Sequence, residues 1–126
     1  MFMKINRMIV CVALMLISVG MSARTEKTWI QGSVGKLAAV VQVPDGLAEG
    51  EKCPVVILMH GFMGNKDGMM EKVAGDMLAQ QGIASVKFDF NGHGESEGEY
   101  IGFGLLERYD CVAWAEWASD YLKNKE

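Results

Sequence analysis

Two apolar runs in the middle of the chain predict internal strands. Val55 to Met59 is apolar at every position, and Ile83 to Phe90 is a second strand-like run. Runs that lack strict polar alternation suit parallel strands covered on both faces. Upstream, Trp29 to Ser33 and Leu37 to Val43 are also strand-like, and Gly35-Lys36 between them fits a tight reversal. The sequence therefore predicts a β-hairpin before the two internal strands.

Helical spacing follows each internal strand. The first predicted helix ends at Gly82 and has a stripe expected to pack in the core, made of Met70, Val73, Ala74, Met77, Leu78 and Gln81. The second, from Leu105 to Lys123, has one side formed by Leu106, Tyr109, Ala113, Trp117 and Tyr121. The order of hairpin followed by βαβα predicts an α/β fold with parallel strands and with chemistry at their carboxyl ends.

The N-terminus has the organisation of a secretory signal peptide. Lys4 and Arg7 precede the apolar stretch Met8 to Ile17, and small residues follow. This stretch is half of the roughly 20 apolar residues that a spanning helix needs. We therefore expect residues 1–23 to be a cleaved signal peptide, with no stable membrane anchor. The protein is predicted to be exported to the periplasm or the extracellular space, and residues 24–126 form the mature domain.

Composition narrows the classes of partner. The chain has 126 residues, is 50% hydrophobic and carries a net charge of −4, so we expect one globular domain. It has no basic run that would bind phosphate backbones, and we expect no nucleic-acid partner. Cys53 and Cys111 lie in the mature part, where a disulfide and two separately buried thiols both remain open. Neither cysteine suggests a metal site.

Two glycine-rich loops carry the most specific motifs. His60-Gly61-Phe62 follows the first internal strand, and the stretch Asp89 to Ser96, DFNGHGES, follows the second. Together they resemble the N-terminal portion of α/β-hydrolases, most closely cinnamoyl or feruloyl esterases and related serine aminopeptidase-like domains. The resemblance implies that the backbone amide of Phe62 supplies half of an oxyanion hole and that Gly61 allows close approach.

The resemblance also implies the other site residues, which are the substrate-loop residues His60, Asn91, Gly92, His93 and Ser96. It implies no metal and no cofactor. A small-molecule ester would be the substrate of the complete enzyme. In the competing interpretation, His60-Gly61 is only a sharp exit from the strand.

Ser96 lies in a false nucleophile motif. Residues 94–98 match G-x-S-x-G, but a nucleophile needs a strained turn directly between a strand and a helix. Here the strand ends near Phe90 and the next helix begins at about Leu105. The neighbouring carboxylates of Glu95 and Glu97 would also oppose a developing oxyanion. We therefore expect Ser96 to form hydrogen bonds within its loop.

The resembled family places its serine, acid and histidine, in that order, beyond a fifth strand. The sequence ends at Glu126, so we expect a partial α/β-hydrolase fold whose C-terminal half is absent. The leading hypothesis is an N-terminal fragment of an exported ester hydrolase, inactive alone. The alternatives are a non-catalytic exported binding or oligomerising module, a decayed remnant, and a split hydrolase completed by a partner. An exposed strand edge is expected to promote self-association.

Overall fold

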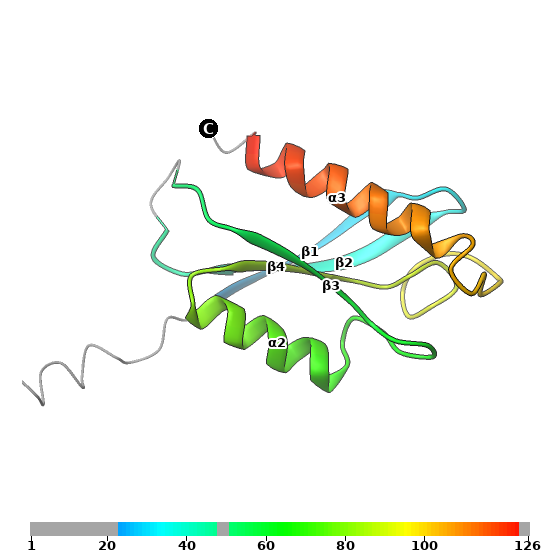
Figure 1. Cartoon of the computed structure of the whole chain (residues 1–126), viewed down its shortest axis with the longest axis horizontal. Helices are drawn as coiled ribbons and strands as arrows, with labels where there is room; N and C mark the ends of the chain where they lie inside the picture. The colour runs from blue at the N-terminus through cyan, green and yellow to red at the C-terminus, as the bar shows by residue number, and fades with distance from the viewer. Residues whose placement is uncertain (1–22, 48–50, 124–126) are drawn as a thin grey trace, which may run out of the picture.

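A mixed four-stranded sheet carries one helix on each face (Figure 1). The computed structural model describes residues 23–47 and 51–123, with side chains described as far as residue 120. The elements are β1 (Ala23–Gln31), β2 (Lys36–Pro44), β3 (Val55–Met59), α2 (Met69–Gln80), β4 (Ala84–Phe88) and α3 (Glu107–Lys123). The strand order is β1-β2-β4-β3, in which only the β3–β4 pair is parallel.

The N-terminal hairpin is confirmed, and its first strand is longer than expected. β1 pairs antiparallel with β2, and the amide of Gly32 donates to the carbonyl of Gly35 at 2.8 Å in the turn. β1 begins at Ala23 rather than at Trp29. Residues 24–27 are exposed, so this half of the strand has no apolar alternation that would have marked it.

The predicted signal peptide lies almost entirely outside the described residues. Ala23, the last residue of the expected segment, is already the first residue of β1. Among the residues described, no helix is long and apolar enough to cross a bilayer.

The core lies between α3 and one face of the sheet. Trp114 of α3 is fully buried, and its ring centroid lies 5.7 Å from that of Phe88 on β4. The remaining buried residues of the cluster are the apolar side chains Leu37, Ala39, Val41, Val43 and Val86. Truncating a buried aromatic of this kind costs about 3–5 kcal/mol. This layer therefore fixes where α3 and its preceding loop sit.

The buried stripe of α3 differs from the predicted one. Tyr109 belongs to the predicted apolar side of the helix, but its side chain is 49% exposed. Glu107, Asp110 and Trp114 are buried instead. The prediction scored apolar positions only, whereas two of the inward positions hold carboxylates that bind loop amides.

The methionine stripe of α2 is exposed, which corrects the expectation that it packs in the core. Met70 and Met77 are 78% and 62% exposed, and Gly75 and Ala79 are the buried residues of the helix. The sheet face beneath α2 is polar: a Cβ added at Gly75 would lie 2.5 Å from Oε1 of Gln42. The helix therefore rests on the sheet through its smallest residues and turns its methionines outward.

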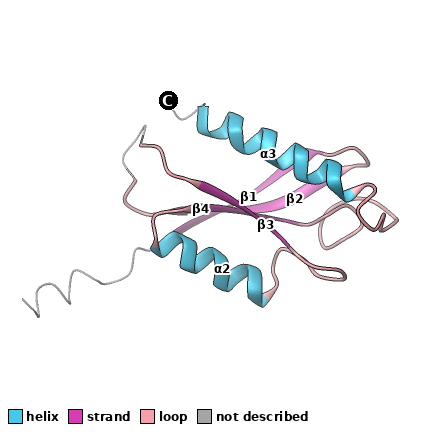
Figure 2. Ribbon diagram, in the orientation of Figure 1, coloured by secondary structure: helices cyan, strands magenta, loops and turns pink. Residues whose placement is uncertain are grey.

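β3 and β4 deliver both motif loops to the same end of the sheet. They pair in parallel, and Met59 lies opposite Phe88 at their carboxyl ends (Figure 2). β3 is at the edge of the described sheet and is only half-buried, not covered on both faces as its sequence suggested. The two glycine-rich loops therefore lie at the carboxyl ends of this parallel pair, where the sequence placed the chemistry.

Candidate functional site

A tight turn follows β3 and exposes a backbone donor. The amide of Gly64 donates to the carbonyl of Gly61 at 3.0 Å, and Met63 takes a left-handed φ of 60°. Within the described part of the chain, the amide of Phe62 has no hydrogen-bond partner. A Cβ added at Gly61 would meet no atom within 4 Å, so the space beside this turn is open. A carbonyl oxygen could approach the Phe62 amide there.

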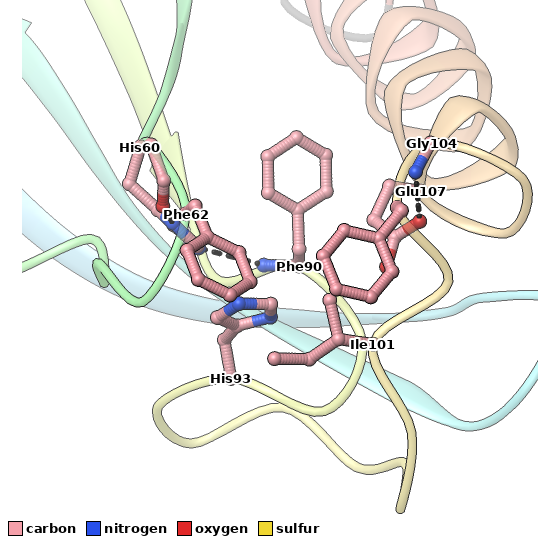
Figure 3. Close-up of a pocket in the computed structure, with 9 residues that line it drawn as sticks. His60, Phe62, Phe90, His93, Ile101, Gly104 and Glu107 are labelled. Carbon is pink, nitrogen blue, oxygen red and sulfur yellow. Dashed lines mark hydrogen bonds between the residues drawn. The ribbon is translucent and has the colours of Figure 1, made fainter.

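A cavity of about 300 Å³ lies beside this turn (Figure 3). It is lined mainly by rings, and its full lining is His60, Gly61, Phe62, Phe90, His93, Ile101, Phe103, Gly104 and Glu107. The rings of Phe62 and Phe103 stack with centroids 5.5 Å apart and planes 25° apart. Pockets of this size and character hold small apolar ligands.

Both ring nitrogens of His60 are engaged. Nδ1 lies 2.8 Å from the carbonyl of Gly61, so it must carry the proton and donate. Nε2 accepts a hydrogen bond from the amide of Phe90 at 3.2 Å. The ring therefore links the end of β3 to the end of β4 and is not free to take a proton from a substrate.

His93 presents a different arrangement. Its Nδ1 lies 3.0 Å from the carbonyl of Asn91 and so donates, which leaves Nε2 as an acceptor. This Nε2 atom is buried and has no partner among the described residues. The rings of His60 and His93 lie 4.9 Å apart, so the structure brings the two histidines together at the pocket.

The two motif loops are tied by a buried ionic network that the sequence interpretation missed. Asp89 is fully buried and accepts hydrogen bonds from the Lys66 amide, from Lys66 Nζ and from the Glu95 amide. Lys66 also donates to Glu95 at 2.6 Å. Burial alone lowers the pKa of Lys66, but hydrogen bonds to Glu95, Asp89 and Asp67 outweigh it and raise that pKa. The ammonium therefore stays charged.

A second carboxylate organises the loop before α3. Glu107 accepts hydrogen bonds from the amides of Gly102 and Gly104, at 2.6 and 2.8 Å. Burial tends to raise the pKa of Glu107, but these backbone hydrogen bonds outweigh it and lower that pKa. Phe103, between the two glycines, has a left-handed φ of 49°. Sequence reasoning missed both Phe103 and Glu107 as pocket residues.

Three of the predicted substrate-loop residues do not line the pocket. The amide of buried Asn91 donates to Asp110 at 2.8 Å, and Gly92 makes a turn with φ of 73°. The hydroxyl of Ser96 accepts from the Ala38 amide at 2.9 Å and donates to the Asp89 carbonyl at 2.6 Å. The Ser96 bond to Asp89 lies within the motif loop, as expected, whereas its bond to Ala38 attaches the loop to β2. The Asn91 bond to Asp110 attaches the loop to α3.

The two described cysteines are not bonded to each other. Cys53 and Cys111 are free thiols, and Cys111 lies 3.3 Å from the sulfur of Met59. Among the described residues, no group of three or more His, Cys, Asp or Glu side chains could hold a metal ion.

Solved structures with a similar fold include an α/β serine hydrolase homologue and a protein solved with ferulic acid bound. The chain is 29% identical to an α/β serine hydrolase homologue from Coxiella burnetii, with a TM-score of 0.69 over 78% of this chain and 47% of that one. It is 27% identical to Est1E from Butyrivibrio proteoclasticus, solved with ferulic acid bound, with a TM-score of 0.65 over 73% and 36%. The predicted α/β-hydrolase fold, present here in part, is confirmed.

Sequence comparisons give a family. An uncharacterised 31.7-kDa protein of Escherichia coli, from the traX–finO intergenic region, is 36% identical over 83 residues. These residues are 65% of this chain and 28% of that protein, so the chain spans under a third of this relative. The family model of X-Pro dipeptidyl-peptidases matches residues 32–125. The chain therefore belongs to the X-Pro dipeptidyl-peptidase (S15) family, within the α/β-hydrolase clan.

Proposed function

We propose that this chain supplies the oxyanion-binding part of the active site of an exported serine ester hydrolase. The observation that carries the proposal is the unpartnered Phe62 amide beside an apolar pocket at the carboxyl end of β3. In an acyl transfer, negative charge develops on the carbonyl oxygen, and each preorganised donor contributes about 3–4 kcal/mol to the transition state. The open space beside Gly61 allows that oxygen to reach the amide.

The nucleophile in this proposal comes from another part of the natural polypeptide. Both hydrogen-bonding roles of the Ser96 hydroxyl are in use, and both nitrogens of His60 are engaged. A serine activated by a histidine and an acid would attack the ester carbonyl, release the alcohol and form an acyl-enzyme that water hydrolyses. Phe62 would stabilise the tetrahedral oxyanion in both steps.

Peptide hydrolysis is the second candidate, because the matched family is described as a peptidase. A dipeptidyl-peptidase substrate carries an α-ammonium group, which needs an anionic partner in the site. Glu107 is the carboxylate among the pocket residues, and both its oxygens already accept backbone amides. This arrangement favours an uncharged ester over an N-terminal dipeptide.

The test uses the complete natural polypeptide that contains these residues, beside the 126-residue chain alone. We expect the complete polypeptide to hydrolyse 4-nitrophenyl acetate faster than an Xaa-Pro 4-nitroanilide, and the 126-residue chain to hydrolyse neither. A fluorophosphonate should label one serine outside residues 23–123, and Ser96→Ala should leave labelling intact. Labelling at Ser96, or no turnover by the complete polypeptide, would refute the proposal; the latter would favour a non-catalytic binding module.

A further inference from the structure

A strained turn places an exposed aromatic ring against the pocket. Phe103 has a left-handed φ of 49°, which residues other than glycine rarely adopt. Its side chain is 81% exposed, so burial of the ring does not explain the conformation. Strained residues persist where the surrounding structure holds them, and they gather at functional sites.

The surrounding structure that holds Phe103 is the carboxylate of Glu107. One oxygen accepts the amide before Phe103 and the other accepts the amide after it, at 2.6 and 2.8 Å. Gly102 cannot be replaced freely, because an added Cβ would lie 2.9 Å from the side chain of Leu106. Hydrogen bonds to a carboxylate are stronger than those between neutral groups. The turn is therefore fixed from both sides.

The ring of Phe103 lies against the ring of Phe62, the residue whose amide is proposed to bind the oxyanion. The ring of Phe103 stacks on that of Phe62 with centroids 5.5 Å apart, and both rings line the cavity. Phe90 lines the same cavity beside Phe62 (Figure 3). A group bound at the Phe62 amide must therefore lie beside these aromatic faces. Aromatic pairs gain from offset stacking or edge-to-face packing at centroid distances of 4.5–7 Å, so a flat aromatic acyl group gains a contact here that a saturated, puckered ring lacks.

We propose that Phe103 is a specificity-determining residue that selects flat acyl groups, and that Glu107 is its positioning residue. This inference rests on the proposed hydrolase function and names the acyl class that the same site prefers. Glu107 does not touch the reacting atoms; it acts by holding the turn on either side of Phe103. Loss of either side chain should widen the pocket at the same place.

The experiment compares two acyl groups of matched size in the complete natural polypeptide. The substrates are 4-nitrophenyl benzoate, which is flat, and 4-nitrophenyl cyclohexanecarboxylate, which is puckered. We expect the ratio of their kcat/KM values to favour benzoate, and to fall about tenfold in Phe103→Ala and in Glu107→Gln. The double variant should show no further fall in the ratio, because both changes remove the same aromatic contact, that of Phe103. Tyr100→Ala removes another exposed aromatic of the same loop that does not line the pocket, and should leave the ratio unchanged.

Separate readouts distinguish failure of this inference from failure of the proposed function. If neither ester is hydrolysed, the hydrolase proposal fails. Saturation-transfer NMR of benzoate and cyclohexanecarboxylate binding then tests directly whether Phe103 favours the flat ligand. Preferential benzoate binding that is lost in Phe103→Ala supports the inference. An unchanged ratio or preference in Phe103→Ala overturns it. A fall in Phe103→Ala without one in Glu107→Gln overturns the positioning role.

Discussion

Lys66 and Asp89 are joined twice, by the backbone amide of Lys66 at 2.6 Å and by its Nζ at 2.9 Å. Both side chains are buried, and the pair connects the loop after β3 with the loop after β4. Because the amide of Glu95 also binds Asp89, one carboxylate orders both motif loops. The position of the Phe62 turn therefore depends on an ion pair that lies outside the pocket.

Removing one partner of the Lys66–Asp89 ion pair should lower the stability of the fold. We expect Asp89→Asn to lower the free energy of unfolding by about 3–5 kcal/mol, because it removes the one buried carboxylate beside Lys66 and leaves the ammonium only the exposed carboxylates of Glu95 and Asp67. Lys66→Met should also destabilise, and the double variant should lose less than the sum of the two. Chemical denaturation measures all three. Glu95→Gln is the matched control: its side chain is 47% exposed, so its loss should cost under about 1 kcal/mol. Additive single effects would show that the pair is not coupled.

Two glycines of the motif loops should respond in opposite ways to alanine. Gly61→Ala should leave the melting temperature nearly unchanged, because its Cβ points into open space, yet it should obstruct the approach to the Phe62 amide and reduce ester hydrolysis. Gly94→Ala should destabilise by more than 2 kcal/mol or so, since its φ is 49° and its Cβ would lie 2.4 Å from the Asp89 carboxylate. Calorimetry and a 4-nitrophenyl acetate assay separate the effects. Equal melting temperatures for the two variants would contradict the geometry.

Acid should loosen the Phe103 turn. The folded pKa of Glu107 lies below its ordinary value of 4.5, so its stabilisation is present above pH 4.5 and is lost as the pH falls through the lowered pKa. Nearby Asp110 acts in the opposite direction, because burial raises its pKa. The difference in unfolding free energy between wild type and Glu107→Gln isolates the contribution of the two hydrogen bonds that Glu107 accepts from Gly102 and Gly104. This difference should shrink below pH 4.5. A constant difference down to pH 3 would contradict the claim that the Glu107 carboxylate stabilises the turn.

The open side of the described sheet should promote self-association of the 126-residue chain. β3 is the edge strand, and Met70 and Met77 expose apolar surface on the neighbouring helix. We expect sedimentation velocity to show mass that rises with concentration, and Met70→Glu with Met77→Glu to reduce it. Val34→Glu changes an exposed apolar residue of the hairpin turn and serves as the control. A strictly monomeric chain across the concentration range would contradict this expectation.

The order of elements was predictable because the internal strands and their loops have strong local signals. The apolar run at Val55–Met59 and the glycines after it mark β3 and its exit. The first half of β1 was missed because its side chains are exposed, and the inward face of α3 because Glu107 and Asp110 are polar. Hydrophobic periodicity cannot register a carboxylate that is buried in order to bind amides.

The candidate site was predictable only where a motif marked it. His60, Gly61, Phe62 and His93 come from the two motifs, and the structure brings all four to one pocket. Phe103 was missed because its place opposite Phe62 depends on the fold of a long loop. Lys66 and Asp89 lie 23 positions apart, and only the parallel pairing of β3 with β4 brings them together.

The most direct test of the central claim is the amide signal of Phe62 in the complete natural polypeptide. The protein is labelled with ¹⁵N and treated with a phosphonate that stops ester hydrolysis by modifying the nucleophilic serine. If Phe62 donates to the oxyanion, its amide proton should move downfield, while the amide of Tyr100 should stay in place. A fully inhibited protein whose Phe62 amide signal does not move would contradict the oxyanion role proposed for this chain.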